Sequence, residues 1–271
     1  MNTGSSSKKP AQAGDASTAS NDCSPFSLNG NNADLISSVL MNSFHVTSFI
    51  GCDINGRVLF ANPVASAGLR SIDDSSPINK TLHELAPSEW ADERVELIKL
   101  SIERQRTLYL LEILVGTRLC STLLPIKLSE EHDKGDIPAN EHGEHWICIM
   151  TVEAASPLMV DWLREKFPSE DIVEAQVIDL GKLSVLSPRE LEVAALMGQG
   201  LRQKQIAEHL HRSVSTVDRH RERIGEKLGI TDRVQLVAMA REAALQVEDA
   251  RKTQVSFAEH RLLRHQQKNN Q

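Results

Sequence analysis

The strongest hydrophobic pattern in the chain lies between residues 187 and 228, where apolar side chains recur every three or four residues. Ser187-Pro188-Arg189-Glu190 opens this stretch with a serine cap, a proline at the first helical position and a glutamate three residues after the cap. This capping box predicts a helix that begins here. The helix should end near Gly198 and Gly200, because glycine favours the left-handed conformation found at helix ends.

Two further helices are expected after short breaks in the pattern. One covers residues 202–210, and the next begins at Ser213 or Ser215 and ends at Leu228, before Gly229. Only a few residues separate these two helices, which is the spacing of a helix-turn-helix unit. The apolar faces of the pair would bury Ile206, Ala207, Leu210, Val217, Ile224 and Leu228.

The opposite face of the third helix is charged, and it lies where a helix-turn-helix unit would meet the DNA major groove. Residues 199–241 contain nine basic and five acidic residues, a net charge of +4 in a chain whose net charge is −7. A helical bundle with a solvated charged face, binding no nucleic acid, remains the alternative. The face comprises Asp218, Arg219, Glu222, Arg223 and Glu226, with Arg221 and Lys227 at its margins.

Residues 186–240 resemble the LuxR-type helix-turn-helix domain of bacterial transcription regulators. The resemblance rests on the SPRE opening, Gly200, Lys204, Ile206-Ala207, Leu210, Thr216-Val217, His220, Ile224, Lys227-Leu228-Gly229 and Arg233. It implies an all-α four-helix domain whose third helix reads DNA and whose fourth helix, Arg233 to about Val247, supports dimerisation. The DNA-binding residues it implies are Lys204, Thr216, His220 and Lys227 at phosphates and Asp218-Arg219 at bases, with Ser215, Glu222 and Arg223 on the same surface.

Two positions depart from the family pattern. Where this chain has Asp218, the family usually has a basic or neutral polar residue, and where it has Gly225, the family usually has a larger side chain. A glycine inside an exposed helix costs about 1 kcal/mol relative to alanine, and an acid in the groove repels phosphate. We expect Asp218 either to accept a hydrogen bond from a cytosine amino group or to pair with Arg221. A dimer seam is expected at Leu236, Ala240, Ala243 and Val247.

The pattern before residue 154 is of a different kind and predicts strands. Strands are expected at 46–52 and 57–60, helices at about 64–69 and 90–105, and three more strands at 107–115, 118–128 and 145–152. A short helix is expected before them, near Leu35 to Leu40. This order predicts an α+β domain with a five-stranded antiparallel sheet and helices on one face.

Residues 35–153 resemble a PAS domain. The resemblance rests on Asp53-x-x-Gly56-Arg57-Val58, on Asn62 and on Thr81-Leu82-x-Glu84-Leu85-x-Pro87. Asp53, Gly56 and Asn62 are expected to build turns rather than to bind a ligand. PAS domains hold haem, flavin or a metabolite, or bind only a protein. Residues 92–104 lack the histidine that haem would need, and the cysteine motif of photoreactive flavin domains is absent, so no cofactor is expected.

The chain therefore divides into an α+β PAS-like part and an all-α LuxR-type part. The expected segments are a disordered tail at 1–33, a PAS-like sensor or interaction domain at 34–155, a linker at 156–179, the helix-turn-helix domain at 180–245 with its motif at about 202–221, and a polar tail at 246–271. The linker is expected to contain an amphipathic helix with Met159, Trp162, Leu163 and Phe167. This helix would either form a dimer contact or pack under the sheet.

Composition narrows the class of protein. No run of about 18 apolar residues occurs and no apolar core follows the N-terminus, which argues against a membrane span or a secretory signal. The cysteines at 23, 52, 120 and 148 have no metal-finger spacing, which favours a reducing cytoplasm. Residues 34–154 carry a net charge of −8 and residues 187–271 one of +4, so nucleic-acid binding would be confined to the C-terminal part.

The leading hypothesis is a non-enzymatic transcription regulator in the cytoplasm. Its partners would be double-stranded DNA, a second copy of the chain, and a small ligand or a protein at the PAS-like domain, with no membrane. One alternative is an adaptor that binds only proteins. The other is a metal-dependent enzyme that uses the histidine-bearing loop at 129–144, although a solvated loop explains those residues without a metal.

Overall fold

The computed structural model describes residues 48–69, 76–129, 135, 137–154 and 157–269. The expected tail at 1–33 and the expected helix near Leu35 to Leu40 lie outside these residues. No helix in the described part of the chain is long and apolar enough to cross a bilayer.

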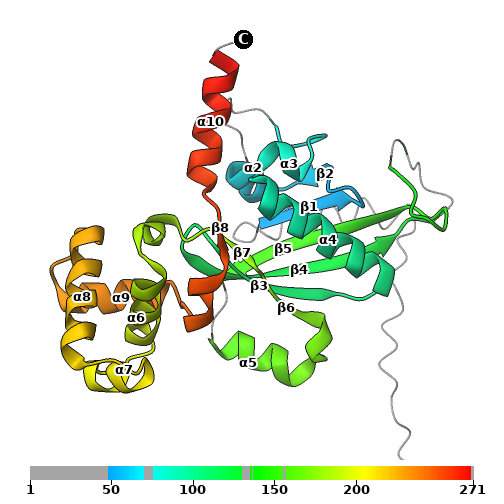
Figure 1. Cartoon of the computed structure of the whole chain (residues 1–271). Helices are drawn as coiled ribbons and strands as arrows, with labels where there is room; N and C mark the ends of the chain where they lie inside the picture. Colours follow the sequence, from blue (N-terminus) through cyan, green and yellow to red (C-terminus); the bar gives the residue numbers. More distant parts are fainter. Residues whose placement is uncertain (1–47, 70–75, 130–134, 136, 155–156, 270–271) are drawn as a thin grey trace, which may run out of the picture.

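A mixed sheet forms the centre of the N-terminal part (Figure 1). Its five antiparallel strands are those the sequence predicts: β1 (Ser48–Asp53), β2 (Val58–Ala61), β3 (Leu108–Leu114), β4 (Thr117–Lys127) and β5 (Trp146–Ala154). The order across the sheet is β2-β1-β5-β4-β3-β6. The sixth strand, β6 (Ile172–Glu174), comes from the stretch expected to be a linker and pairs in parallel with β3.

Helices α2 (Pro63–Leu69), α3 (Leu82–Leu85) and α4 (Ser88–Arg104) belong to this part of the chain. Figure 1 shows α4 running across one face of the sheet. Its apolar side covers that face, with Val95, Ile98 and Ile102 in the same core as Leu108 and Leu123 of the strands. The α+β architecture expected from the sequence, a sheet with helices packed on one face, is therefore present.

The turn residues of the PAS-like pattern have structural roles. Asp53 Oδ1 accepts hydrogen bonds from the backbone N–H of Asn55 at 2.8 Å and of Arg57 at 2.9 Å, and Gly56 has a φ of 74°. Asn62 Oδ1 accepts from the N–H of Phe49 at 3.2 Å and of Ala65 at 2.9 Å, joining β1 to the start of α2. These contacts confirm that the three residues build turns.

The expected amphipathic helix is α5 (Pro157–Lys166), and it packs on the sheet. Leu163 is buried with Leu111 and Cys120 on the face opposite to α4, and the rings of Phe167 and Tyr109 lie 4.4 Å apart. The structure thus bears out packing under the sheet, one of the two roles expected for this helix. The chain continues through η1 (Ser169–Asp171), β6 and β7 (Val177–Ile178).

The C-terminal helices are α6 (Pro188–Gly198), α7 (Gln203–His209), α8 (Val214–Leu228) and α9 (Arg233–Glu242), preceded by η2 (Gly181–Val185). The fourth helix ends earlier than expected, because Ala244 has a left-handed φ of 46°. The dimer seam expected there is wrong. Leu236, Ala240 and Ala243 are buried in this chain, where α9 packs on α6, and Val247 lies beyond the helix.

The segment after residue 245, expected to be a frayed helical extension and a polar tail, is more structured than the sequence indicates. This segment forms η3 (Val247–Arg251), β8 (Thr253–Gln254) and α10 (Phe257–Asn269). Strand β8 pairs in parallel with β7, and the buried ring of Phe257 lies 5.3 Å from that of Trp90 on α4. The apolar anchors here are few and widely spaced, so the sequence shows no periodic pattern.

Buried Asp179 contacts both of the segments that link the sheet to the helix-turn-helix part, one before α6 and one after η3. Its Oδ1 accepts a hydrogen bond from the N–H of Gly181 at 2.8 Å, and its Oδ2 accepts one from the N–H of Phe257 at 3.2 Å. Further along α10, Arg261 donates to the carbonyl of Gly68 at 2.6 Å, which keeps the helix beside α2 (Figure 1). The helix-turn-helix part is therefore connected to the sheet from both of its ends.

Candidate nucleic-acid interface

The residues at the start of α6 form the helix cap that the sequence predicts. Ser187 Oγ accepts a hydrogen bond from Glu190 N, and Glu190 Oε2 accepts one from Ser187 N at 2.8 Å, which completes the capping box. Arg189 on the first turn donates to the carbonyl of Leu210 at 3.0 Å. The N-terminus of α6 thereby holds the end of α7 and fixes the turn that follows.

The turn between α7 and α8 has well-defined caps. His211 takes a φ of 52°, and Ser213 then caps α8 by accepting a hydrogen bond from Thr216 N at 3.2 Å. Of the two serines considered, Ser213 is therefore the cap. Val217 and Ile224 are buried, and Gly229 ends the helix with a φ of 67°.

Helix α8 lies away from the sheet (Figure 1), and the face that should meet DNA is exposed. Arg219 and Arg223 are exposed, and neither has an ion-pair partner among the residues that the structure describes. Ser215 and Glu222 are exposed on the same helix, Thr216 is half-buried, and Lys204 is exposed on α7. These six side chains form the open part of the expected site.

Asp218, in contrast, is engaged within the domain. Gln203 Nε2 donates a hydrogen bond to Asp218 Oδ1, and Arg221 Nη2 lies 3.8 Å from the same oxygen. The pairing with Arg221 that the sequence left open is thus present. Gln203 was not among the expected site residues, because no local pattern links it to a residue fifteen positions later.

Lys227 also contacts the protein itself. Its Nζ lies 2.7 Å from Oε2 of Glu190, whose side chain is buried. Burial acts to raise the pKa of Glu190, but hydrogen bonds from Lys227 and Ser187 outweigh it, and the pKa lies below its usual value of 4.5. Lys227 therefore joins the end of α8 to the capping box of α6, and this contact competes with any phosphate.

His220 is half-buried rather than exposed on the reading face. Burial lowers its pKa below the usual 6.5, and the neighbouring Arg189 lowers it further. The imidazole is therefore mostly neutral at pH 7 and supplies little positive charge. Its buried Nδ1 has no hydrogen-bond partner among the described residues.

Gly225 departs from the family pattern because a backbone group lies against it. A Cβ at this position would lie 2.6 Å from the carbonyl oxygen of Ile230, just beyond the end of α8. The backbone N–H of Ile230 also donates to the Gly225 carbonyl at 2.8 Å. Glycine is needed for this close return of the chain, which local sequence cannot reveal.

We expect Gly225→Ala to destabilise the helical domain despite the higher helix propensity of alanine. Relieving the contact with Ile230 requires a backbone shift, and overpacking of this kind costs about 1 to 3 kcal/mol. Urea denaturation followed by far-UV circular dichroism measures the change. Gly68→Ala in α2 is the matched control, because its Cβ meets nothing within 4 Å, and it should be neutral or stabilising. Equal effects of the two substitutions would contradict this explanation.

Comparison with known protein families gives a match at the C-terminal helices. Residues 184–240 match the family described as bacterial regulatory proteins, luxR family. This segment is a LuxR-type helix-turn-helix domain. The match covers the capping box, the turn and all of α8.

Curated relatives match part of this chain. BvgA of Bordetella pertussis, a regulator of virulence-factor transcription, is 35% identical over 95 residues, which cover 33% of this chain and 44% of BvgA. NreC of Staphylococcus aureus, an oxygen regulatory protein, is 45% identical over 56 residues, which cover 21% of this chain and 26% of NreC. The chain thus spans less than half the length of these relatives.

Solved structures with similarity over most of the chain include VqmA of Vibrio cholerae. A VqmA dimer without target DNA, described among LuxR-type receptors, has a TM-score of 0.37 at 17% identity, covering 83% of this chain and 95% of VqmA. A VqmA–ligand–DNA complex has a TM-score of 0.40 at 19% identity, covering 81% and 93%. These values are too low to establish a shared arrangement of the two parts.

Proposed function

We propose that this protein is a sequence-specific DNA-binding transcription regulator, without enzymatic activity, that inserts α8 into the major groove. The observation that carries the proposal is the exposed face of α8 within a LuxR-type domain, on which Arg219 and Arg223 are both exposed. Basic side chains on a helix of this kind contact phosphates and guanine edges. The PAS-like part would receive a ligand or a protein partner. The protein would act in the cytoplasm.

Within this proposal, Arg219 reads a base, whereas Asp218 pairs with residues of its own domain. Arg219 is exposed near the N-terminal end of α8, the end that contacts base edges in such units. The carboxylate of Asp218 accepts a hydrogen bond from Gln203 and lies beside the guanidinium of Arg221, which offsets part of its negative charge in the unbound protein. Lys204, Ser215, Thr216 and Arg223 are proposed to contact the backbone around the groove.

Arg219→Ala should cost about 1 to 3 kcal/mol on the preferred site and little on random DNA. The loss follows from removing a bidentate guanine contact, which carries sequence information. The preferred site is first selected from a genomic library and then measured by fluorescence anisotropy against a scrambled duplex. Arg241→Ala, which removes an exposed arginine near the end of α9, is the charge-matched control and should leave the ratio of the two affinities unchanged. An unchanged ratio in Arg219→Ala itself would contradict the base-reading role.

Asp218→Ala tests the function proposed for the acid. Because Asp218 is paired with Gln203 and Arg221, we expect the variant to bind the preferred and the scrambled site in the same ratio as the parent protein. An exposed pair of this kind contributes only about a few tenths of a kcal/mol to the helix. A preferred-site affinity that falls selectively would instead assign Asp218 a direct base contact.

We propose that two copies bind together on DNA. Helix-turn-helix readers commonly bind as dimers on two half-sites about one helical turn, roughly 34 to 36 Å, apart. The buried positions on α9 are unavailable for this contact, so another surface must join the copies.

A further inference from the structure

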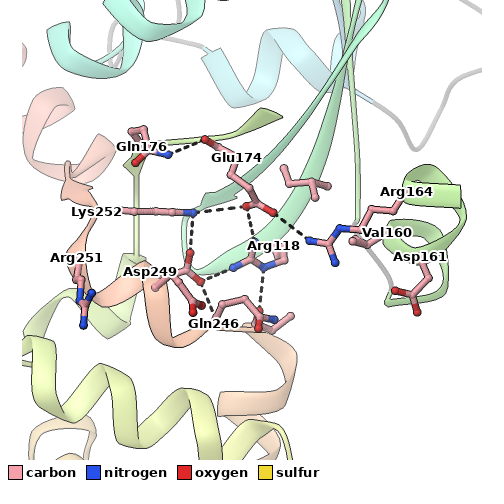
Figure 2. A pocket seen from close by; sticks show the side chains of 13 residues that line it. Arg118, Val160, Asp161, Arg164, Glu174, Gln176, Gln246, Asp249, Arg251 and Lys252 are labelled. Atoms are coloured by element: carbon pink, nitrogen blue, oxygen red, sulfur yellow. Dashed lines mark hydrogen bonds and ion pairs between the residues drawn. The ribbon is translucent and has the colours of Figure 1, made fainter. Parts of the chain in front are cut away.

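A cavity of about 580 Å³ lies where the segment after α9 returns to the sheet (Figure 2). One wall carries Arg118 of β4, Arg164 of α5 and Glu174 of β6. The other wall is formed by η3 and the residue after it, with Asp249 and Lys252. The volume falls within the range of about 300 to 1,000 Å³ that is common for small-molecule sites.

The most buried charged residues of the lining, Arg118 and Asp249, form an ion pair. Arg118 is 7% exposed and Asp249 is 2% exposed, and the guanidinium of Arg118 donates to Asp249 Oδ2. Arg118 Nε also donates to the carbonyl of Ala244 at 2.9 Å, while Lys252 Nζ lies 2.8 Å from Asp249 Oδ1. Each oxygen of Asp249 therefore faces a cation, and this carboxylate belongs to the framework of the site.

Glu174 is held quite differently. Three cationic groups converge on its carboxylate: Arg118 Nη1 at 3.6 Å, Arg164 Nη2 at 3.5 Å and Lys252 Nζ at 3.6 Å (Figure 2). Each distance exceeds the 2.7 to 3.2 Å or so of a normal charged hydrogen bond. The Glu174 side chain is also 42% exposed. Its carboxylate is a loosely held counter-ion among three cations.

We propose that this cavity binds a small organic acid. The ligand carboxylate would be held by Arg118, Arg164 and Lys252 in place of the Glu174 carboxylate, which would turn to solvent. The apolar part of the ligand would lie against Leu111, Val160 and Ala244, which line the same cavity. Asp161 also borders the cavity, but its side chain points away from the network in Figure 2.

An occupant would contact both parts of the protein at once. Arg118 and Arg164 belong to the sheet and the helix beneath it, whereas Lys252 and Ala244 belong to the segment that leaves the helix-turn-helix domain. A ligand bound to both walls stabilises the arrangement in which they are close. The inference rests on this geometry and does not depend on DNA binding.

The test uses the full chain with benzoate as the probe and benzamide, its uncharged analogue, as the reference ligand. Binding is followed by ligand-observed NMR titration at low ionic strength. We expect saturable binding of benzoate and weaker binding of benzamide. Glu174→Gln should tighten benzoate binding by about two- to fivefold, because it removes the competing carboxylate, and Arg164→Gln should weaken it by a similar factor.

Glu165→Gln on α5 is the matched control. It makes the same change in net charge as Glu174→Gln, but Glu165 is exposed and contacts Lys166 rather than the cavity. We expect this variant to bind benzoate as the parent does. The proposal is overturned if benzoate does not saturate, if benzamide binds equally well, or if Glu174→Gln binds benzoate no more tightly than Glu165→Gln.

Discussion

Asp249→Asn should lower the free energy of unfolding by about 3 to 5 kcal/mol, the usual cost of leaving a buried charge without its partner. The substitution keeps an oxygen that can accept the hydrogen bond from Gln246 N, which Asp249 Oδ2 accepts at 2.7 Å. The loss would therefore come from the charge. Arg118 and Lys252 are 7% and 9% exposed, and among the described residues the loosely held Glu174 would be their one remaining acidic partner, beside the Ala244 carbonyl that accepts from Arg118. Urea denaturation followed by tryptophan fluorescence measures the change.

A double substitution separates this effect from a general defect. In Arg118→Met/Asp249→Asn one of the two buried cations is also removed, so much of the lost stability should return. Glu248→Gln, a neighbouring exposed acid on η3, is the control and should change the free energy of unfolding by less than about 0.5 kcal/mol. A cost below about 1 kcal/mol for Asp249→Asn would show that the pair does not hold the two parts together.

Glu112→Leu should have a comparable effect within the PAS-like part, again about 3 to 5 kcal/mol. Arg94 on α4 is fully buried, and its guanidinium donates to the carboxylate of Glu112, which is 2% exposed. Glu112 also accepts from Ser121 Oγ, and the guanidinium of Arg94 lies 4.6 Å from the centre of the Trp90 ring. Among the described residues, removing the carboxylate leaves Glu93, at 2.7 Å and at the edge of the core, as the one acidic partner of the arginine.

The double variant Arg94→Met/Glu112→Leu should recover most of that loss, since it replaces both charges with apolar groups of similar size. Equilibrium urea denaturation of the single and double variants completes a double-mutant cycle. If the double variant is as unstable as Glu112→Leu alone, then the pair is not the source of the effect.

How far the sequence predicts this structure depends on the distance between the interacting residues. The capping box at Ser187 and Glu190, the cap at Ser213 and the turn residues Asp53 and Gly56 act within four residues of one another. Local chemistry alone therefore identifies these elements correctly. The sequence also predicts the five antiparallel strands, because their apolar residues form continuous runs that are separated by turn residues.

The features that were missed depend on contacts across long stretches of chain. Phe257 is one aromatic residue in a polar segment, and only its contact with Trp90 shows that the last helix is anchored. Gly225 is explained by the carbonyl of Ile230, and the engagement of Lys227 depends on Glu190, thirty-seven residues earlier. The apolar stripe of α9 has the spacing of a dimer seam, but the same spacing serves packing against α6 within one chain.

The most direct test of the central claim is the affinity of the full chain for a genome-selected DNA fragment, measured across a range of salt concentrations. If α8 lies in the major groove with basic side chains on the phosphates, the logarithm of the binding constant should fall linearly with the logarithm of the salt concentration. The affinity for the selected fragment should exceed the affinity for a scrambled duplex at every salt concentration. Absence of any complex at low salt, on any fragment, would contradict the account and favour an adaptor that binds only proteins.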